Sequence, residues 1–319
     1  MKALGLIQMA IVLMAAAPPA HRPSASNRPL QFVDLTDDFD RIWEQTKTVP
    51  DERRVETFQT DFERLLPGFY SAKRVSDFIK PERYHAMILQ GLKDYPQQRA
   101  GIRRVSREFI ALSTPARREF EGYFGPMRGY PPIYLVHSFG EFDGGTRDLK
   151  DGNHLMFGAD MIDRLYGNKP IKPLVEHELF HLMHHRTFKD CHAVWCNLWE
   201  EGLATYVASK FNPWADDAAL GLTVPAPIRP EVEANRQAAI CAVRQRVDSE
   251  KSEDYAPLFY GNQKLPGLPA RMGYYVGLLV VQEIGQTRDL KQLAAMQPDE
   301  LRPLIVQTLD KLANCSQAS

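Results

Sequence analysis

The sequence lacks an excess of charge of either sign. Its 319 residues include 39 lysines and arginines and 40 aspartates and glutamates, which gives a formal net charge of -1. A chain without a basic surplus has no long-range field that would attract nucleic acid or an anionic membrane surface. We therefore expect no nucleic-acid partner.

Several recognisable patterns are also missing. The chain has no internal repeat, no low-complexity tract, no Walker or dinucleotide-binding glycine loop, and no motif for a nucleophilic serine or cysteine. Its 44% hydrophobic and 25% charged residues are typical of a globular protein with a substantial core. The composition thus favours a globular enzyme and excludes a disordered scaffold.

Long apolar runs are scarce, and the run at the N-terminus is too short to span a membrane comfortably. It follows Lys2, covers residues 3–17 and ends at a pair of prolines. This pattern predicts a signal peptide, residues 1–26, cleaved somewhere between positions 17 and 26. We expect a secreted or periplasmic mature protein without stable membrane insertion; an uncleaved anchor is the alternative.

Cysteine is scarce too, with four residues in the whole chain. An even number can pair completely, which agrees with an oxidising compartment. Of the three possible pairings we favour Cys191 with Cys196, which closes a small loop, and Cys241 with Cys315, which ties down the C-terminal segment. Zinc ligation by cysteine is the rival interpretation, but CxxxxC without a second such pair is a weak metal pattern.

What the sequence does contain is an HExxH pentapeptide at residues 177–181. Residues four apart on a helix project from the same face, so His177 and His181 can both bind one ion, with Glu178 beside them. Pro173 suits a first helical turn, and the apolar residues around the motif supply surface to bury the helix. The pentapeptide therefore predicts two metal ligands and a base on a buried helix.

A third ligand has to come from elsewhere, because a catalytic zinc site usually has three protein ligands and a position for water. Residues 198–207 have the pattern of a second amphipathic helix, and a carboxylate at its start could complete the site. Eighteen residues separate His181 from Glu200 and nineteen separate it from Glu201, which is enough for a connection and a returning helix. Both glutamates remain candidates, and His192 in the connector is a weaker one.

The two motifs together resemble the gluzincin metallopeptidases, in which the HExxH helix is followed by a glutamate-ligand helix with the pattern EG-x-A-x-Y. That pattern is found here at residues 201–206, and the resemblance covers roughly residues 130–285. It implies one zinc ion per chain, Glu201 as the third ligand, and a peptide or protein substrate. The interval between the motifs is one residue longer than in the best-known members, which leaves Glu200 open as the ligand.

The other histidines near the motif do not extend it. A metzincin needs glycine three residues and histidine six residues after His181, and these positions hold His184 and Thr187. His184 lies on the same helical face as the motif histidines, and His185 lies one turn beyond His181. We interpret both as polar residues near a helix C-terminus, where the helix dipole favours them.

A later segment, residues 273–277, reads Gly-Tyr-Tyr-Val-Gly. Zinc peptidases commonly use a hydrogen-bond donor opposite the metal to stabilise the oxyanion. In some gluzincin-like families a GY-x-x-G segment holds this donor, so the resemblance implies Tyr274, with Tyr275 as the alternative. Gly273 and Gly277 would let the helix approach the site closely. Two tyrosines packed in a core are the structural alternative.

The periodicity of the chain predicts an α+β fold that is mainly helical, with a small sheet before the zinc helix. Strands are expected at residues 133–136 and 154–159, with a turn at Gly144-Gly145. In gluzincins an edge strand pairs with the extended substrate, and residues 154–159 are our candidate for it. Helices are expected at residues 35–48, 50–66, 80–94, 96–124, 230–249 and 271–285, with two short closing helices in 287–314.

Three segments follow along the chain. We expect the signal peptide, a helical N-terminal part at residues 27–125, and a zincin-like metallopeptidase core with a helical C-terminal part at residues 126–319. Pro50 and Pro115 are expected to start or break helices.

The predicted function is that of an exported zinc-dependent peptidase. Glu178 would take a proton from a zinc-activated water as it attacks the peptide carbonyl, and would pass the proton to the departing amine. The alternative is a catalytically inactive binding protein with the same fold. Retention of Glu178 favours the enzyme, since a binding protein has no need of a base at that position.

Overall fold

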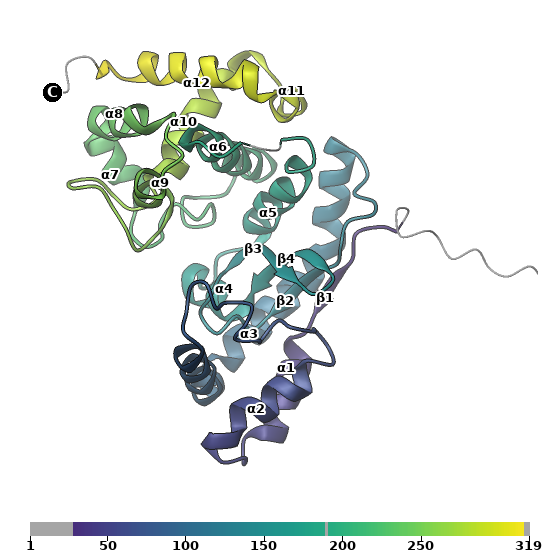
Figure 1. The fold of residues 1–319 in the computed structure, drawn as a ribbon. Helices are drawn as coiled ribbons and strands as arrows, with labels where there is room; N and C mark the ends of the chain where they lie inside the picture. The colour runs from purple at the N-terminus through teal and green to yellow at the C-terminus, as the bar shows by residue number, and fades with distance from the viewer. Residues whose placement is uncertain (1–27, 189–190, 316–319) are drawn as a thin grey trace, which may run out of the picture.

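The computed structural model describes residues 28–188 and 191–315, in which α-helices surround a small four-stranded sheet (Figure 1). The predicted α+β, mainly helical fold class is therefore confirmed. The expected signal peptide lies outside the described residues. Among the described residues no helix combines the length and apolar character needed to cross a membrane.

The sheet contains both predicted strands and two that were not predicted. Its strands are β1 (Phe32–Asp34), β2 (Ile133–Val136), β3 (Gly144–Leu149) and β4 (Gly152–Gly158), in the spatial order β1-β2-β4-β3. The β1–β2 and β2–β4 pairs are parallel, and β3 is antiparallel to β4. Because β1 comes from the N-terminal part of the chain and pairs with β2, the two parts share one core.

Two expectations about this sheet are wrong. Gly144-Gly145 do not form a turn; they begin β3, which pairs with β4 along its full length. Residues 154–159 are not an edge strand, because β4 lies between β2 and β3. The glycine pair was read from local turn preference, whereas the ladder of bonds to β4 decides its conformation. The free edge near the predicted zinc helix belongs to β3.

The N-terminal part consists of three helices, α1 (Thr36–Thr46), α2 (Asp51–Phe62) and α3 (Pro81–Phe124). The expected separate helices at 80–94 and 96–124 are one helix of 44 residues with Pro96 and Pro115 inside it. The expected role of Pro115 as a breaker is therefore wrong. Each proline removes one backbone hydrogen bond, but a buried apolar face runs along the whole helix and outweighs this local cost.

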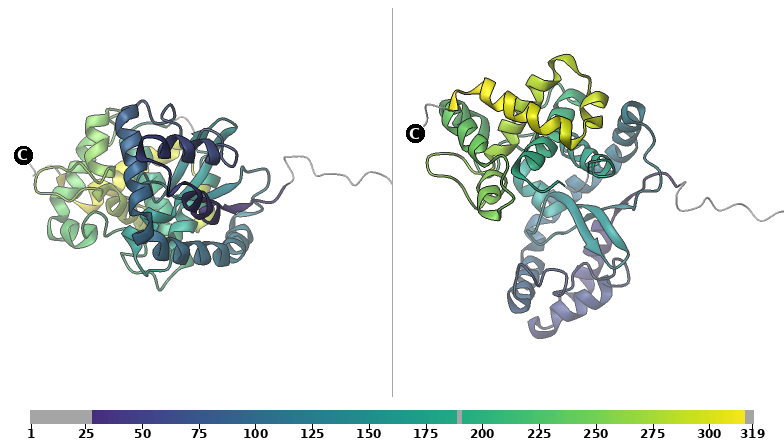
Figure 2. Two further views of the ribbon diagram at one scale, coloured as in Figure 1. Left: turned by 90° about the horizontal axis from the view of Figure 1, so that it is seen from below. Right: turned by 45° about the horizontal axis from the view of Figure 1, so that its top comes forward.

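Helix α3 packs on the sheet and joins it to the rest of the molecule. The Phe109 ring lies 5.5 Å from the Phe32 ring of β1 and 5.6 Å from the Phe157 ring of β4, measured between centroids. Helices α1 and α2 lie on one side of the sheet, and the helices after residue 228 lie on the other (Figure 2). Between them come α4 (Ala159–Tyr166), α5 (Lys172–His184) and α6 (Val194–Phe211).

The C-terminal part is helical, as expected. Its helices are α7 (Ile228–Ala234), α8 (Arg236–Arg246), α9 (Ser252–Phe259), α10 (Met272–Ile284), α11 (Leu290–Ala295) and α12 (Pro298–Leu312). The expected helix at 271–285 and the two closing helices are confirmed. The single helix expected at 230–249 is wrong, because the chain leaves helical geometry at Asn235, where φ is -128° and ψ is 35°. Asparagine favours such helix ends.

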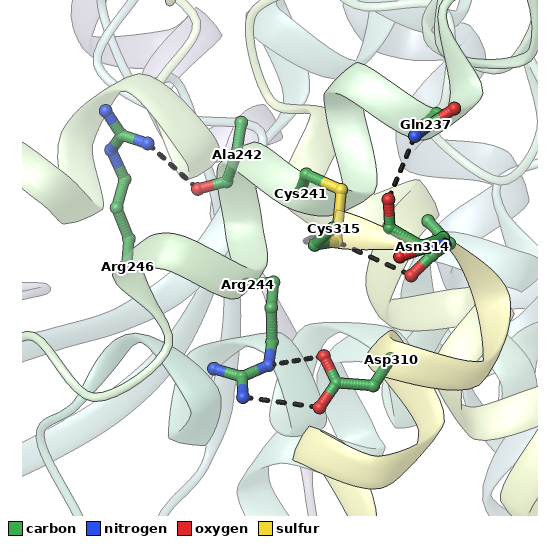
Figure 3. Close-up of a disulfide and its surroundings, with 9 residues drawn as sticks. Gln237, Cys241, Ala242, Arg244, Arg246, Asp310, Asn314 and Cys315 are labelled. Atoms are coloured by element: carbon green, nitrogen blue, oxygen red, sulfur yellow. Dashed lines mark hydrogen bonds and ion pairs between the residues drawn. A yellow bond between two sulfur atoms is a disulfide. The ribbon is translucent and has the colours of Figure 1, made fainter. Parts of the chain in front are cut away.

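Both predicted disulfides are confirmed. Cys191 is bonded to Cys196 between α5 and α6, and Cys241 is bonded to Cys315. Figure 3 shows the second bond joining α8 to the segment after α12, beside an ion pair in which Arg244 Nε donates to Asp310 Oδ1 at 2.8 Å. The two interactions hold α12 against α8.

Helices α6 and α10 cross at a pair of glycines. A Cβ atom placed on Gly202 would lie 2.4 Å from the carbonyl carbon of Gly277, and one placed on Gly277 would lie 2.4 Å from the Leu198 carbonyl oxygen. Side chains never approach backbone atoms this closely, so neither position has room for a methyl group. This crossing brings residues 201 and 274 toward the same space.

The crossing yields a stability prediction. We expect Gly277→Ala to lower the free energy of unfolding by about 1–3 kcal/mol, because α6 and α10 must move apart to admit the methyl group. The measurement is urea unfolding followed by circular dichroism. The matched control is Gly122→Ala in α3, where a Cβ would meet nothing within 4 Å. It should stabilise the protein by up to about 1 kcal/mol, since alanine favours helix over glycine. Equal effects of the two substitutions would contradict close helix contact at Gly277.

Candidate metal centre

Three side chains from two helices meet at one point. The Nε2 atoms of His177 and His181 lie 3.0 Å apart, and Glu201 Oε2 lies 3.2 Å from the first and 3.3 Å from the second. Among the described residues these three form the one group of histidine, cysteine or acidic side chains arranged to hold a metal ion. Two imidazole nitrogens and a carboxylate oxygen are a common ligand set for zinc.

The helical spacing of the motif produces half of this arrangement. His177 and His181 are one turn apart on α5, which begins with Pro173 in its first turn, as predicted. Glu201 comes from α6, which lies against α5 and α10 and is buried on nearly every side. The expected amphipathic character of the helix around residues 198–207 is therefore wrong. Its apolar residues pack against α5, α10, α11 and α12 rather than against a single neighbour.

Burial and charge act against each other within the cluster. Burial alone would lower the pKa of the His181 imidazole, but the Glu201 carboxylate raises it to about 9. Burial alone would raise the pKa of the Glu201 carboxyl, but His181 and His177 hold it well below its usual range. In the metal-free protein the cluster therefore keeps a proton that a bound cation would displace.

The two glutamate candidates of α6 have different surroundings. Glu201 faces the histidine pair, whereas Glu200 Oε1 lies 3.1 Å from Nε2 of His185, whose side chain is 53% exposed. The structure thus brings Glu201, and not Glu200, to the two motif histidines. His192 is exposed and is not part of the cluster.

Glu178 lies beside the cluster and against the edge strand. A Cβ atom on Gly144 of β3 would be 2.9 Å from Glu178 Oε1, so glycine at this position makes room for the carboxylate. Burial raises the pKa of the Glu178 carboxyl, and the neighbouring His177 and His181 oppose that shift. A carboxylate with a raised pKa next to a metal site is suited to accept and release a proton.

The two tyrosines of α10 point to different places. Tyr274 lines the same cavity as the cluster, and its ring centroid lies 6.5 Å from that of His177. Burial and the Glu201 charge raise the pKa of its hydroxyl, which therefore stays protonated. Tyr275 donates its hydroxyl proton to Glu233 Oε1 at 2.5 Å and does not line the cavity. Of the two, only Tyr274 is placed to serve the site.

His184 is not a charged residue at a helix end. Its ring stacks between Phe180 and Phe188, with centroids 5.0 Å and 4.9 Å away, and neither ring nitrogen has a hydrogen-bond partner among the described residues. Burial lowers the pKa of the imidazole to about 3. The dipole interpretation is wrong for this residue because it is neutral and packed in the core. His185, which is exposed, pairs with Glu200.

The cluster opens into a cavity of about 320 Å³. Its wall includes β3, both ends of α5, part of α6, the loop at residues 219–221 and the start of α10. Five polar residues on this wall were not singled out in the sequence: Asp143, Thr146, Tyr166, Asn197 and Arg271. Asp143 and Tyr166 lie outside the motifs, and no local pattern points to them. Arg271 is the first residue of the predicted helix at 271–285, and this position is the only signal that marks it.

Comparison with known proteins adds no relative. No protein-family model, curated protein sequence or solved structure matches the chain significantly.

The geometry predicts which substitutions remove bound metal. Protein purified with zinc should hold one ion per chain, and His177→Ala, His181→Ala and Glu201→Gln should each lower zinc affinity at least about 10–100-fold, because each removes a ligand. Glu200→Gln is the matched control and should keep full zinc content. Zinc is measured by inductively coupled plasma mass spectrometry after dialysis. Loss of zinc in Glu200→Gln with retention in Glu201→Gln would assign the third ligand to the other glutamate.

Proposed function

We propose that the chain is an exported zinc-dependent peptidase of the gluzincin type. The observation that carries the proposal is the meeting of His177, His181 and Glu201, with Glu178 beside them, at the wall of a cavity. These two imidazoles and one carboxylate would give a bound zinc ion three protein ligands, the number found in catalytic sites, in which water or substrate takes the fourth position. The donor set therefore fits zinc in a catalytic rather than a closed structural role.

In the proposed hydrolysis, Glu178 and Tyr274 have separate roles beside the metal ion. When bound, zinc supplies a Lewis acid that acidifies water and polarises the substrate carbonyl. Glu178 accepts the proton of the attacking water, and the raised pKa of its carboxyl allows it to hold that proton and deliver it to the departing amine. Tyr274 donates a hydrogen bond to the carbonyl oxygen as negative charge develops there.

The edge strand supplies a binding surface for an extended peptide. One edge of β3 is unpaired in the sheet, and its residues 144–146 line the cavity next to Glu178. A peptide that adds to this edge as a further strand would lay its backbone across the catalytic residues. In this proposal β3 takes the role that the sequence had suggested for residues 154–159.

Export is supported by the cysteine chemistry. All four cysteines are paired in two disulfides, and none is free. Disulfides persist in secreted and periplasmic proteins and are rare in a reducing cytosol. Together with the N-terminal apolar run in the sequence, this favours a secreted or periplasmic protein.

The base assignment gives the sharpest test of enzymatic function. Glu178→Gln keeps the size of the side chain but cannot accept a proton, so it should retain zinc and lose about 10²–10⁴-fold in the rate of peptide hydrolysis. The assay is cleavage of a diverse peptide library by the zinc-loaded protein, followed by mass spectrometry. If wild-type protein with full zinc cleaves no peptide yet binds one tightly, the inactive binding protein is the better description.

The oxyanion assignment is tested on the two adjacent tyrosines. Tyr274→Phe removes one hydrogen-bond donor and should reduce turnover by up to about 10²-fold while sparing zinc content. Tyr275→Phe is the matched control; it loses the bond to Glu233, which does not involve the cavity, and should leave turnover unchanged. Equal losses in both variants would show that the tyrosines act only through packing of α10.

A further inference from the structure

Arg271 stands at the wall of the cavity immediately before α10. It is the only lysine or arginine among the described residues that line the cavity. Its guanidinium carbon lies 4.3 Å from the centre of the Tyr274 ring, which also neighbours the rings of His177 and Phe259. One tyrosine ring therefore separates this cation from the metal cluster.

Neutral groups hold the guanidinium in place. Nη1 donates to the carbonyl oxygens of Val224 at 3.2 Å and Gly221 at 3.5 Å. No carboxylate of the described residues forms an ion pair with Arg271, unlike Arg74, which pairs with Glu141, and Arg229, which pairs with Asp217; Arg54, which is buried, also lacks such a pair. Burial alone would lower the pKa of the Arg271 guanidinium. The Asp143 carboxylate attracts the guanidinium and helps to raise that pKa, but no carboxylate of the described residues lies within ion-pair distance of it.

The carboxylates that line the cavity make their hydrogen bonds and close contacts with groups other than Arg271. Asp143 accepts the Tyr166 hydroxyl proton at 3.0 Å on Oδ2 and the Gly144 amide proton at 3.1 Å on Oδ1. Glu201 belongs to the metal cluster, and Glu200 pairs with His185. A carboxylate from outside the chain would supply the missing partner, and the planar guanidinium is shaped to bind one through two parallel hydrogen bonds.

The cavity that contains Arg271 also has apolar lining. Leu174, one turn before His177 on α5, and Ala219 and Leu220 line it. The cavity thus combines apolar side chains with one cation. Such a combination binds an amphipathic group, with methylenes on the wall and an anion at the guanidinium.

We propose that Arg271 binds a carboxylate of the substrate, at a residue close to the scissile bond. The proposal rests on the peptidase function proposed above. The carboxylate has two possible sources, the free C-terminus of the peptide or an aspartate or glutamate side chain. The first would make the protein trim chain ends, and the second would make it cut beside acidic residues.

Peptide binding to the zinc-loaded Glu178→Gln protein tests the proposal without depending on turnover. The probes are N-acetyl-trialanine with a free C-terminal carboxylate, its C-terminal amide, and the amide with aspartate or asparagine at the middle position. Isothermal titration calorimetry should give at least about tenfold tighter binding of one carboxylate peptide than of its neutral partner. A preference for the free acid identifies the C-terminus as the source, and a preference for aspartate identifies the side chain.

Added substitutions assign the preference to Arg271. In the same protein, Arg271→Met should abolish the preference, and Arg271→Lys, which keeps the charge but not the planar fork, should retain part of it. Arg229→Met is the matched control, because Arg229 lies 4.8 Å over the Tyr275 ring and does not line the cavity. It should keep the full preference.

Three outcomes would overturn the proposal. They are equal binding of acid and neutral peptides, no binding of any probe, and a preference that survives Arg271→Met. A uniform loss of affinity for all peptides in Arg271→Met, with the ratio unchanged, would show that Arg271 acts only by supporting Tyr274. If the carboxylate preference holds while wild-type protein cleaves nothing, the subsite stands and the peptidase function fails.

Discussion

The contact between Gly202 and Gly277 is the constraint on which the site depends. Glu201 immediately precedes the first glycine on α6, and Tyr274 lies one turn before the second on α10. Because the two backbones touch, the carboxylate of one helix and the phenol of the other reach the same cavity. His177 and His181, which lie one turn apart on α5, add two imidazoles to the same cavity. A larger residue at the crossing would separate the groups that have to act together.

Only some of the charged groups around this crossing have a partner of opposite sign. Glu201 faces two imidazoles, Glu200 faces His185, and Asp143 is held by neutral donors. Glu178 lies against Gly144, where burial raises the pKa of its carboxyl. Among the described residues no carboxylate lies within ion-pair distance of Arg271, although the Asp143 charge helps to raise the pKa of its guanidinium. Glu178 and Arg271 are therefore the two charged groups of the cavity that a substrate can use.

The local parts of this site were predictable from the sequence, and the parts set by distant contacts were not. The spacing of His177 and His181 follows from helix geometry, and the EG-x-A-x-Y resemblance indicated Glu201, which the structure brings to the histidine pair.

The edge position of β3 was missed because two glycines suggest a turn unless their pairing with β4 is known. The place of Arg271 likewise depends on distant residues, since it donates to the carbonyls of Gly221 and Val224. The prolines led to a wrong helix prediction for the same reason. Burial of the apolar face of α3 outweighs the loss of the backbone hydrogen bonds that Pro96 and Pro115 cannot donate. His184 is different, because Phe180 and Phe188, which stack on its ring, are only four residues away on either side.

X-ray absorption spectroscopy at the zinc edge of the metal-loaded, full-length protein tests the ligand set most directly. The expected first shell contains two imidazole nitrogens and oxygens from Glu201 and water, at about 2.0–2.2 Å, without sulfur. Substitution of Glu201 by glutamine should change the oxygen contribution and leave both imidazole signals. A shell with sulfur at about 2.3 Å, or with three or more imidazoles, would contradict a site built from His177, His181 and Glu201.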